Sequence, residues 1–531
     1  MRVVVALSGP IASGKSTLAR AFVDRGFVPF RTSCYIADKL AIVHQKPNAT
    51  RAEKQEYGDY LDRETQFGWV CAAIENIGHN VVIDSVRRIE QVERLRECGR
   101  YRVVHIHLEA DPADLAARWH SRTGEHGSYE QAKAHATEAQ VDSMRADADL
   151  VINTSRCTLE DVRLRALAMI DVPNHDRLVD VLVGGQYGSE GKGHVVSHIA
   201  REYDLLVRVG GPNAGHTVLS PVNNRKTSFY HLPSGALHAP GADLVLGPGA
   251  VINVEVLEKE AMHLGGLDSL RGRLWIDPQA NIITREDIDR EADLVGRVGS
   301  TGQGVGMATA RKIAYRGDPE RQSLARDCPA LAPFIRPTLD VLENAYRRRL
   351  RILLEGTQGT GLSLHHGVYP YVTSRDTTVS GTAGEAGIPA SRIRRSIVVL
   401  RTNPIRVQSP PGGTSGPMGI ETTWETISQR AGIPADELRQ REMTTTTKRQ
   451  RRVAEFNWAD LRRAVLLNGP SDIALTFVDY IAYENRNARR FEQLTPETQA
   501  FIFEIERVSG VPVSLITTRF HQRSIIDRRN W

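Results

Sequence analysis

Two glycine-rich turns constrain the fold of this chain more than any other feature. The first, GPIASGKS, covers residues 9–16 and follows the apolar run VVVALS; the second, VGGQYGSEGKG, covers residues 183–193 and follows VDVL. A turn between a buried strand and a helix directs backbone N–H groups and the positive helix end toward an anion. The sequence therefore predicts two α/β units, each with a phosphate-binding turn.

The length of the chain and the spacing of the turns predict two domains. A chain of 531 residues is too long for one ordinary core. Strand-like and helical segments alternate until the stretch DVPNHDR at 171–177 interrupts them. We expect a first domain over residues 1–173, with helices on both faces of a parallel sheet, and a second α/β domain with a large, mostly parallel sheet over residues 178–531.

Composition argues against several classes of protein. Hydrophobic residues make up 41% and charged residues 25% of the chain, and no apolar run reaches the roughly 18 residues of a membrane span. The net charge of +5 is small for this length, so we expect small-molecule substrates as partners, with no nucleic acid and no membrane. The five cysteines lack CxxC spacing and the N-terminus leads directly into a strand. These features favour a cytoplasmic protein without a signal peptide, disulfides or a zinc site.

The first turn matches the phosphate-loop pattern GxxxxGK[ST]. The amino group of Lys15 is expected to reach the outer phosphates of a nucleotide such as ATP, and the hydroxyl of Ser16 to ligate Mg²⁺. The other residues expected to contact phosphate are Gly9, Ser13, Gly14 and Thr17.

Polar residues elsewhere in the first domain point to phosphoryl transfer. Asp84 ends the strand-like segment NVVIDS, where it is suited to a role at Mg²⁺, and Arg87 follows it. The helical LAARWHSR adds Arg118 and Arg122, which resemble the phosphate-clamping arginines of nucleoside monophosphate kinases. An ordinary strand-end acid and a solvated helix face are the alternative interpretation. The domain is similar to phosphate-loop kinases, and its acceptor stays open.

The second domain carries an ordered series of motifs. After GQYGSEGKG come RVGGPNAGHT, HLPSG, GSTGQGVG, LEGTQGT, GVYPYVTS and TTTTKRQRR. The series resembles the adenylosuccinate synthetase family over nearly all of residues 178–531. This resemblance implies a large, mostly parallel sheet and a homodimer. It also implies a ligase reaction, in which a nucleoside triphosphate phosphorylates the 6-oxygen of a purine monophosphate and L-aspartate then displaces that phosphate.

The resemblance further implies roles for individual residues. Lys192 and its turn hold the donor phosphates, the carbonyl of Gly215 ligates Mg²⁺, and His216 is the general acid toward the 6-oxygen, a task that suits its pKa near neutrality. Ser189 stands at a catalytic position, and Gln358 is expected to serve both catalysis and monophosphate binding. The remaining positions are Gly188, Glu190, Gly191, Gly193 and Thr217 for the donor phosphates, and Asn213, Thr301 and Thr373 for the monophosphate and its base.

The amino-acid and donor-base positions are only partly those of the family. Arg449 and Arg451 match the arginines that hold the aspartate carboxylates, with Thr446 and Thr447 beside them. Asp479 matches the residue that binds the donor base. The family lysine two positions before it is Phe477, and TTRFHQR at 517–523 replaces the family's closing turn. The donor is therefore left open between ATP, GTP and dATP.

The family has an aspartate, which removes the purine N1 proton, where this chain has Ser189. A serine hydroxyl is neither a base near neutral pH nor a strong metal ligand. The form GSEGKG resembles a variant of the family from bacteriophages whose DNA contains 2-aminoadenine, which uses deoxyguanylate (dGMP) in place of inosinate (IMP). Guanine has an amine beside N1, and a serine leaves room for it and can accept its hydrogen bond.

We therefore expect a bifunctional purine-nucleotide enzyme, located in the host cytoplasm if it is phage-encoded. A ligase that joins L-aspartate to dGMP is fused to a nucleotide kinase. Two alternatives remain: an ordinary adenylosuccinate synthetase that acts on IMP, and a nucleotide-binding regulator in which Ser189 has ended catalysis.

Overall fold

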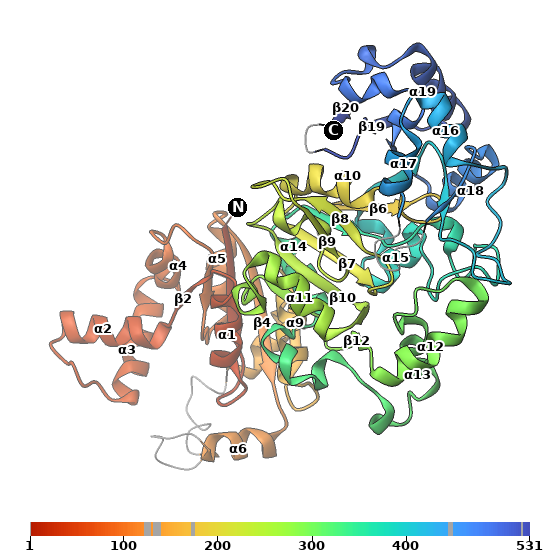
Figure 1. Cartoon of the computed structure of the whole chain (residues 1–531). Helices are drawn as coiled ribbons and strands as arrows, with labels where there is room; N and C mark the ends of the chain where they lie inside the picture. The colour runs from red at the N-terminus through yellow and green to blue at the C-terminus, as the bar shows by residue number, and fades with distance from the viewer. Residues whose placement is uncertain (1, 122–128, 131–139, 171–175, 444–449, 522–523) are drawn as a thin grey trace. The chain divides into compact units, whose positions relative to one another are not determined.

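The computed structural model (Figure 1) describes residues 2–121, 129–130, 140–170, 176–443, 450–521 and 524–531. The chain divides into two compact units, Met1–Pro173 and Asn174–Trp531. Each unit is built on its own sheet. None of the helices described is both long and apolar enough to cross a membrane.

The first unit contains a five-stranded parallel sheet with the strand order β2-β3-β1-β4-β5. Its strands are β1 (Arg2–Ser8), β2 (Val28–Phe30), β3 (Val81–Ile83), β4 (Tyr101–Glu109) and β5 (Leu150–Asn153). Its α-helices are α1 (Lys15–Val23), α2 (Thr32–Val43), α3 (Arg51–Glu64), α4 (Trp69–Ile74), α5 (Ile89–Glu97), α6 (Pro112–His120) and α9 (Leu159–Ala168).

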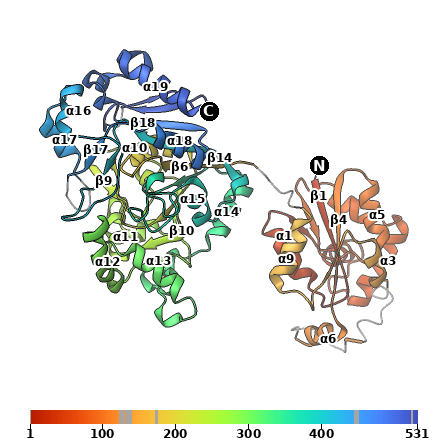
Figure 2. The ribbon, with the colours of Figure 1, turned by 90° about the vertical axis from the view of Figure 1, so that its right-hand side faces the viewer.

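The apolar side chains of β1 point alternately to the two faces of the sheet, and helices cover both faces. Val5 and Leu7 pack with residues of α1 and α9, whereas Val4 and Ala6 pack with residues of α2, α4 and α5. Figure 2 shows α1 and α9 on one side of β1 and β4, and α5 on the other. The predicted parallel sheet with helices on both faces is confirmed.

The second unit is organised around a ten-stranded sheet with the order β11-β10-β7-β13-β6-β14-β18-β19-β20, in which β12 also pairs with β10. All its pairs are parallel except that of β19 with β20. The strands are β6 (Val179–Gly184), β7 (Leu205–Gly210), β10 (Asp243–Ile252), β11 (Leu274–Ile276), β12 (Asn281–Ile282), β13 (Ile352–Glu355), β14 (Ile393–Arg401), β18 (Asp472–Thr476), β19 (Val513–Thr517) and β20 (Ile525–Asp527).

Helices cover both faces of this large sheet, and two smaller sheets stand apart from it. The helices are α10 (Lys192–Ile199), α11 (Val254–Ala261), α12 (Arg285–Val298), α13 (Val305–Ala314), α14 (Thr338–Arg347), α15 (Val379–Ala386), α16 (Trp424–Ala431), α17 (Ala435–Arg441), α18 (Trp458–Asn468) and α19 (Pro496–Ser509). A hairpin joins β8 (His216–Leu219) to β9 (Lys226–Phe229), and β15 (Ile405–Arg406), β17 (Arg452–Ala454) and β16 (Glu421–Thr422) form a three-stranded sheet.

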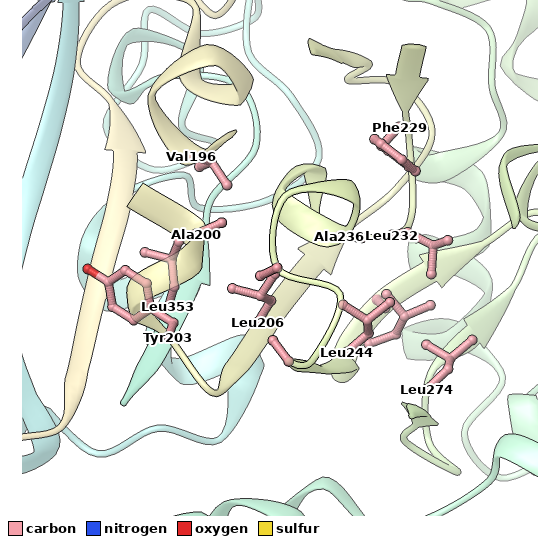
Figure 3. Close-up of a cluster of buried hydrophobic side chains, with 14 of the residues drawn as sticks. Val196, Ala200, Tyr203, Leu206, Phe229, Leu232, Ala236, Leu244, Leu274 and Leu353 are labelled. Atoms are coloured by element: carbon pink, nitrogen blue, oxygen red, sulfur yellow. The ribbon is translucent and has the colours of Figure 1, made fainter. Parts of the chain in front are cut away.

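Side chains from successive positions of β6 enter different cores. Leu182 belongs to the core that includes residues of α10 and α11, and Val181 and Val183 belong to the core that includes residues of α14, α15, α18 and α19. Figure 3 shows part of the first core, where Val196 and Ala200 lie over Leu206 of β7 and Leu353 of β13. Because β6 lies between β13 and β14, the turn that follows it opens at the centre of the carboxyl edge, where doubly wound sheets bind ligands.

Candidate active site

A buried carboxylate shapes the turn between β6 and α10. Glu190 is fully buried and accepts hydrogen bonds from the backbone N–H groups of Gln186 (3.1 Å) and Gly188 (2.8 Å). The ammonium of Lys192 lies 2.6 Å from the same carboxylate and also donates to the carbonyl of Gln358. Lys192 therefore contacts groups inside the turn, and its predicted contact with donor phosphates stays a prediction.

Left-handed backbone lets this turn reverse into α10. Gly188 and Gly191 have φ of 88° and 86°, conformations that favour glycine, and Gly191 is the N-cap of α10. Ser189 between them also has a positive φ, 54°. Its side chain is exposed, and its carbonyl accepts a hydrogen bond from Nη1 of Arg401 at 3.3 Å. The side chain of Ser189 is thus exposed on the turn, while its backbone carbonyl is fixed by Arg401.

His216 is paired with Glu355, a carboxylate for which the sequence motifs predicted no role. Its Nδ1 makes a short hydrogen bond to Oε1 of Glu355, at the carboxyl end of β13. Glu355 also accepts from the backbone N–H (2.7 Å) and the hydroxyl (2.6 Å) of Ser234, and Nη1 of Arg208 lies 3.4 Å away. All four residues are buried.

The charges in this cluster follow from burial and from the guanidinium. Burial acts to raise the pKa of Glu355, but Arg208 and His216 outweigh it and lower this pKa to about 2. Burial, followed by the charge of Arg208, lowers the pKa of His216 to about 4. The resting pair is a neutral imidazole that donates from Nδ1 to an ionised carboxylate. Nε2 is therefore unprotonated and is the ring nitrogen that can accept a proton.

Three of the predicted monophosphate residues lie together. The side-chain amides of Asn213 (3.4 Å) and Gln358 (3.2 Å) both donate to the hydroxyl of Thr373, and Thr357 donates to Oε1 of Gln358 at 2.8 Å. These neutral groups suit a dianion and a purine. None of the hydrogen bonds described for these residues includes Thr301, whose carbonyl accepts from the side-chain amide of Gln303 at 3.2 Å.

The remaining predicted residues of the first motifs, Gly193, Gly215 and Thr217, make contacts of their own. A Cβ built on Gly193 would lie 3.0 Å from Cβ of His216, so the start of α10 packs on the strand that carries the histidine. A Cβ on Gly215 would lie 2.7 Å from the Tyr230 ring. The hydroxyl of Thr217 bonds Ser228 across the β8–β9 hairpin at 2.8 Å, which is a structural contact.

The described part of the predicted aspartate site is an ion-pair cluster. Nη1 of Arg451 lies 3.3 Å from Glu442, whose carboxylate also accepts from Nη2 of Arg401 (2.8 Å) and the hydroxyl of Tyr480 (2.6 Å). Thr446, Thr447 and Arg449 lie outside the described residues, so their predicted roles stay predictions.

Asp479, the predicted donor-base residue, is 1% exposed, and its Oδ1 has no hydrogen-bond partner among the residues that the structure describes. Nη1 of Arg441 lies 3.4 Å from Oδ2. Burial raises the pKa of Asp479 to about 6. Phe477, in the place of the family lysine, packs on Arg401, whose guanidinium carbon lies 4.1 Å from the ring centroid.

The first unit places its phosphate loop between β1 and α1. Gly9 has a φ of 133°, and a Cβ there would lie 2.0 Å from the carbonyl oxygen of Leu108, so only glycine fits. Gly14, with φ of 101°, is the N-cap of α1. The ammonium of Lys15 donates to the carbonyls of Gly9 (2.7 Å) and Pro10 (2.8 Å), and the buried Oγ of Ser13 has no hydrogen-bond partner within the described part of the chain. Ser16 and Thr17 are exposed at the helix start.

The other predicted residues that are described in this unit, Asp84, Arg87 and Arg118, contact neighbouring protein groups. Asp84 follows β3, which pairs with β1, and its carboxylate lies 3.7 Å from Arg31. The backbone N–H of Arg87 donates to Gln91 at 3.4 Å. The guanidinium of Arg118 donates to the hydroxyl (2.8 Å) and carbonyl (3.1 Å) of Thr154, a contact that anchors α6. Arg122 lies outside the described residues.

Comparison with known proteins decides the family. The model of the adenylosuccinate synthetase family matches residues 181–324 and 318–486. The adenylosuccinate synthetase of Pyrococcus sp. (strain ST700) is 35% identical over 356 residues, which cover 66% of this chain and 98% of that protein. The enzyme of Methanocaldococcus jannaschii is also 35% identical, covering 66% and 96%. This chain belongs to the adenylosuccinate synthetase family. Its predicted class, a carbon–nitrogen ligase, is thereby confirmed.

Solved structures and a second family model extend this result. Cyanophage S-2L succinoaminodeoxyadenylate synthetase, bound to dGMP and to dATP as an energy donor, is 28% identical with a TM-score of 0.54, and covers 67% of this chain and 96% of its own. Adenylosuccinate synthetase from Plasmodium falciparum, 20% identical with a TM-score of 0.55, covers 66% and 100% and supports the fold alone. A model of an AAA domain matches residues 5–138 of the phosphate-loop unit.

The oxygen atoms available to Mg²⁺ differ between the two units of this adenylosuccinate synthetase family member. In the first, the exposed hydroxyl of Ser16 and the carboxylate of Asp84 follow neighbouring strands, a set that fits Mg²⁺. In the second, the carboxylate of Glu190 already accepts hydrogen bonds from Lys192 and from two backbone N–H groups. The ligands that remain for Mg²⁺ are neutral oxygens such as the Gly215 carbonyl. These oxygens fit the ion only together with phosphate charge. Within the described ranges, no group of three or more His, Cys, Asp or Glu could hold a metal.

Sequence reasoning did not single out five residues that shape this adenylosuccinate synthetase site: Arg208, Ser234, Glu355, Arg401 and Glu442. Four of them stand at the end of a buried strand or inside a quoted motif: Arg401 ends β14, Arg208 opens RVGGPNAGHT, Ser234 lies in HLPSG and Glu355 lies in LEGTQGT. The sequence signal that could have identified Glu355 and Arg401 is a charged residue at the end of an apolar run. Glu442 follows a helix and precedes no apolar run, and only the fold shows its partners.

Proposed function

We propose that residues 178–531 join L-aspartate to dGMP and form N6-succino-2-amino-2'-deoxyadenylate, a precursor for DNA that contains 2-aminoadenine. Water or another group would take the N1 proton of guanine as a nucleoside triphosphate transfers its terminal phosphoryl group to the 6-oxygen, and the aspartate amine would then attack C6 and expel phosphate. The observation that carries this proposal is Ser189, which stands exposed on the turn where the family has an aspartate. The likeness to the dGMP-bound cyanophage enzyme supports it.

The residue geometry supports roles for the groups around Ser189. His216 would be the general acid toward the 6-oxygen once Nε2 carries a proton, and Glu355 holds its ring through the Nδ1 bond. Asn213, Gln358 and Thr373 would bind the monophosphate and its base through neutral donors and acceptors. Thr301 would join them only through contacts made with bound ligand.

The amino acid and the donor would occupy the other side of the turn. Arg451, with Arg449, Thr446 and Thr447, would hold the aspartate carboxylates. Asp479 would bind the donor base, and ATP or dATP fits the loss of the family lysine at Phe477 better than the GTP that adenylosuccinate synthetases use. Mg²⁺ held by the phosphates and the Gly215 carbonyl would neutralise charge on the donor. The enzyme would work as a homodimer, as the resemblance implies.

The first unit would act as a (deoxy)nucleoside monophosphate kinase. Its support is the complete phosphate loop, with Lys15 and Ser16 at the start of α1 and Asp84 beside β1. In a fused enzyme it could phosphorylate a deoxynucleotide on the same route. Arg87, Arg118 and Arg122 would contact the transferring phosphates, and Arg118 would first have to release Thr154.

A second candidate for the ligase is the ordinary reaction with IMP. It is favoured by the archaeal adenylosuccinate synthetases that share 35% identity with this chain. In that reaction, as in the one with dGMP, water or another group would have to remove the N1 proton, because a serine hydroxyl is not a base near neutral pH.

One comparison separates these candidates. The purified protein is incubated with L-aspartate, Mg²⁺ and ATP, GTP or dATP, with dGMP or IMP as acceptor, and the products are followed by mass. The proposal expects the succino product from dGMP and little from IMP. Turnover of IMP alone would establish the ordinary reaction, and tight nucleotide binding without turnover of either would favour a regulator.

A further inference from the structure

Glu442 joins three elements around one carboxylate. It follows α17, is 2% exposed, and accepts from Arg401 at the end of β14, from Arg451 directly before β17 and from the hydroxyl of Tyr480. No other described acidic side chain contacts either arginine. The residue belongs to none of the motifs that define the family in this sequence.

The charges of this cluster do not cancel. Burial acts to raise the pKa of Glu442, but Arg401 and Arg451 outweigh it and lower this pKa to about 2, so the carboxylate is ionised. Burial and Glu442 hold the pKa of Tyr480 well above its usual value, so the phenol is neutral. Two guanidinium groups therefore face one carboxylate, and one positive charge is left over in a largely desolvated place. Such a charge favours a bound anion.

Arg401 links the same carboxylate to the catalytic turn. Its Nη1 donates to the carbonyl of Ser189 at 3.3 Å, its Nη2 bonds Glu442 at 2.8 Å, and its guanidinium lies over Phe477. With serine in the turn, no carboxylate at position 189 competes for this guanidinium. Glu442 thus holds both arginines: Arg401, which also contacts the turn, and Arg451, which is itself one of the residues predicted to hold the amino acid.

We propose that Glu442 is a positioning residue for the amino-acid substrate: it fixes Arg451 and Arg401 so that their surplus positive charge is presented to a carboxylate of the substrate. This inference rests on the proposed ligase function. Glu442 itself would not touch the substrate. It would set the distance between the bound amino acid and the purine on the Ser189 turn.

The test separates binding of the amino acid from binding of the nucleotides. Steady-state kinetics of the full chain are measured for the wild type and for Glu442→Gln with whichever purine monophosphate it uses. We expect the KM for L-aspartate to rise about tenfold or more, as loss of a buried charge partner lets the two guanidinium groups repel each other. The KM values for the purine monophosphate and the triphosphate should change less than about twofold.

Matched variants exclude a general loss of structure. Glu421 accepts a hydrogen bond from Nε of Arg452, the next arginine along the chain, at 3.0 Å on an exposed surface. Glu421→Gln removes the same charge from this arginine and should leave the KM for aspartate unchanged. Tyr480→Phe removes one hydrogen bond from Glu442 but keeps its charge and should give an intermediate rise. Glu442→Asp, which keeps the charge, should recover part of the loss and serves as the test if Glu442→Gln does not fold.

The outcomes are distinct from those for the proposed function. A parallel rise in all three KM values, or an unchanged KM for aspartate, in a folded Glu442 variant would overturn the positioning role while leaving the ligase reaction intact. If the wild type turns over neither dGMP nor IMP, the ligase proposal fails. Titration calorimetry with L-aspartate then decides the role of Glu442, since equal affinity in wild type and variant, or no binding, would overturn it.

Discussion

The pair of His216 and Glu355 shows how one buried contact fixes two protonation states. The ionised carboxylate keeps the proton on Nδ1, and Arg208 disfavours a second positive charge on the ring. The histidine can act as an acid only when a bound anion favours its protonation. If His216 is the general acid, as proposed, Glu355 orients its ring and stabilises the imidazolium form.

Replacement of Glu355 by Gln tests this role. The amide oxygen can still accept the Nδ1 proton, but the negative charge is lost, so we expect kcat to fall by about 10- to 100-fold with little change in the KM values. Steady-state rates over pH 6 to 9 are the measurement. Ser234→Ala removes one hydrogen bond from Glu355 and keeps its charge, and should cost less. An unchanged kcat in Glu355→Gln would rule out the electrostatic role.

The titration of Asp479 predicts a pH-dependent donor affinity. Because burial raises its pKa to about 6, the carboxylate loses its charge as pH falls through 6. If it accepts N–H groups of the donor base, the KM for the triphosphate should rise as pH is lowered from 8 to 5. Asp479→Asn should abolish this dependence. A KM that follows the same pH curve in both proteins would exclude Asp479 from donor binding.

The same shift has a stability consequence of opposite sign. The folded state favours the neutral acid, so the contribution of Asp479 to folding is complete below the unfolded pKa of about 4 and is lost as pH rises through about 6. Asp479→Asn should therefore unfold at a higher temperature than the wild type at pH 8, and at a similar temperature at pH 4. A lower unfolding temperature at pH 8 would show that Asp479 is stabilised by its arginine neighbour.

At the scale of elements, the proposed ligase site depends on close contact between two glycine turns. A Cβ on Gly359, in the turn after β13, would lie 2.4 Å from Oε1 of Glu190 and 2.6 Å from the carbonyl oxygen of Gln186. The carboxylate that organises the first turn is therefore packed directly against the second. Neither turn can keep its conformation if the other moves.

Gly359→Ala is expected to damage this contact. The methyl group would displace Glu190, whose bonds to Gly188 and Lys192 hold the turn, so we expect more than a tenfold loss of ligase activity and a lower unfolding temperature. Gly384→Ala in α15, where no atom lies within 4 Å of an added Cβ, is the control and should be neutral or slightly stabilising. Full activity in Gly359→Ala would show that the two turns are not coupled.

The elements themselves could be predicted because local signals and tertiary structure agree. Apolar runs bounded by glycine became β1 and β6, and both phosphate turns lead into helices, as their patterns indicate. The ion-pair partners of the site could not be predicted in this way. Glu442 and Arg451 are brought to Arg401 by the pairing of β15 with β17 and by the packing of the segment after α17, and no local pattern specifies such long-range contacts.

At the scale of the whole molecule, two phosphate turns of similar sequence use their lysines differently. Lys15 is half-buried and its ammonium contacts carbonyls of its own loop, whereas Lys192 is 2% exposed and is paired with Glu190 inside its turn. Each turn is completed within its own unit, on its own sheet. The two reactions should therefore respond separately to substitutions.

Lys15→Ala tests this independence. Removal of the ammonium should abolish phosphate transfer by the first unit, because the outer phosphates lose their cation, and should leave ligation of L-aspartate within about twofold of the wild type. Phosphate transfer is followed as ADP formation from ATP with a panel of deoxynucleoside monophosphates, and ligation by mass. Lys259→Ala, an exposed lysine of α11, should change neither reaction. If Lys15→Ala stops both reactions in a folded protein, the two active sites are coupled.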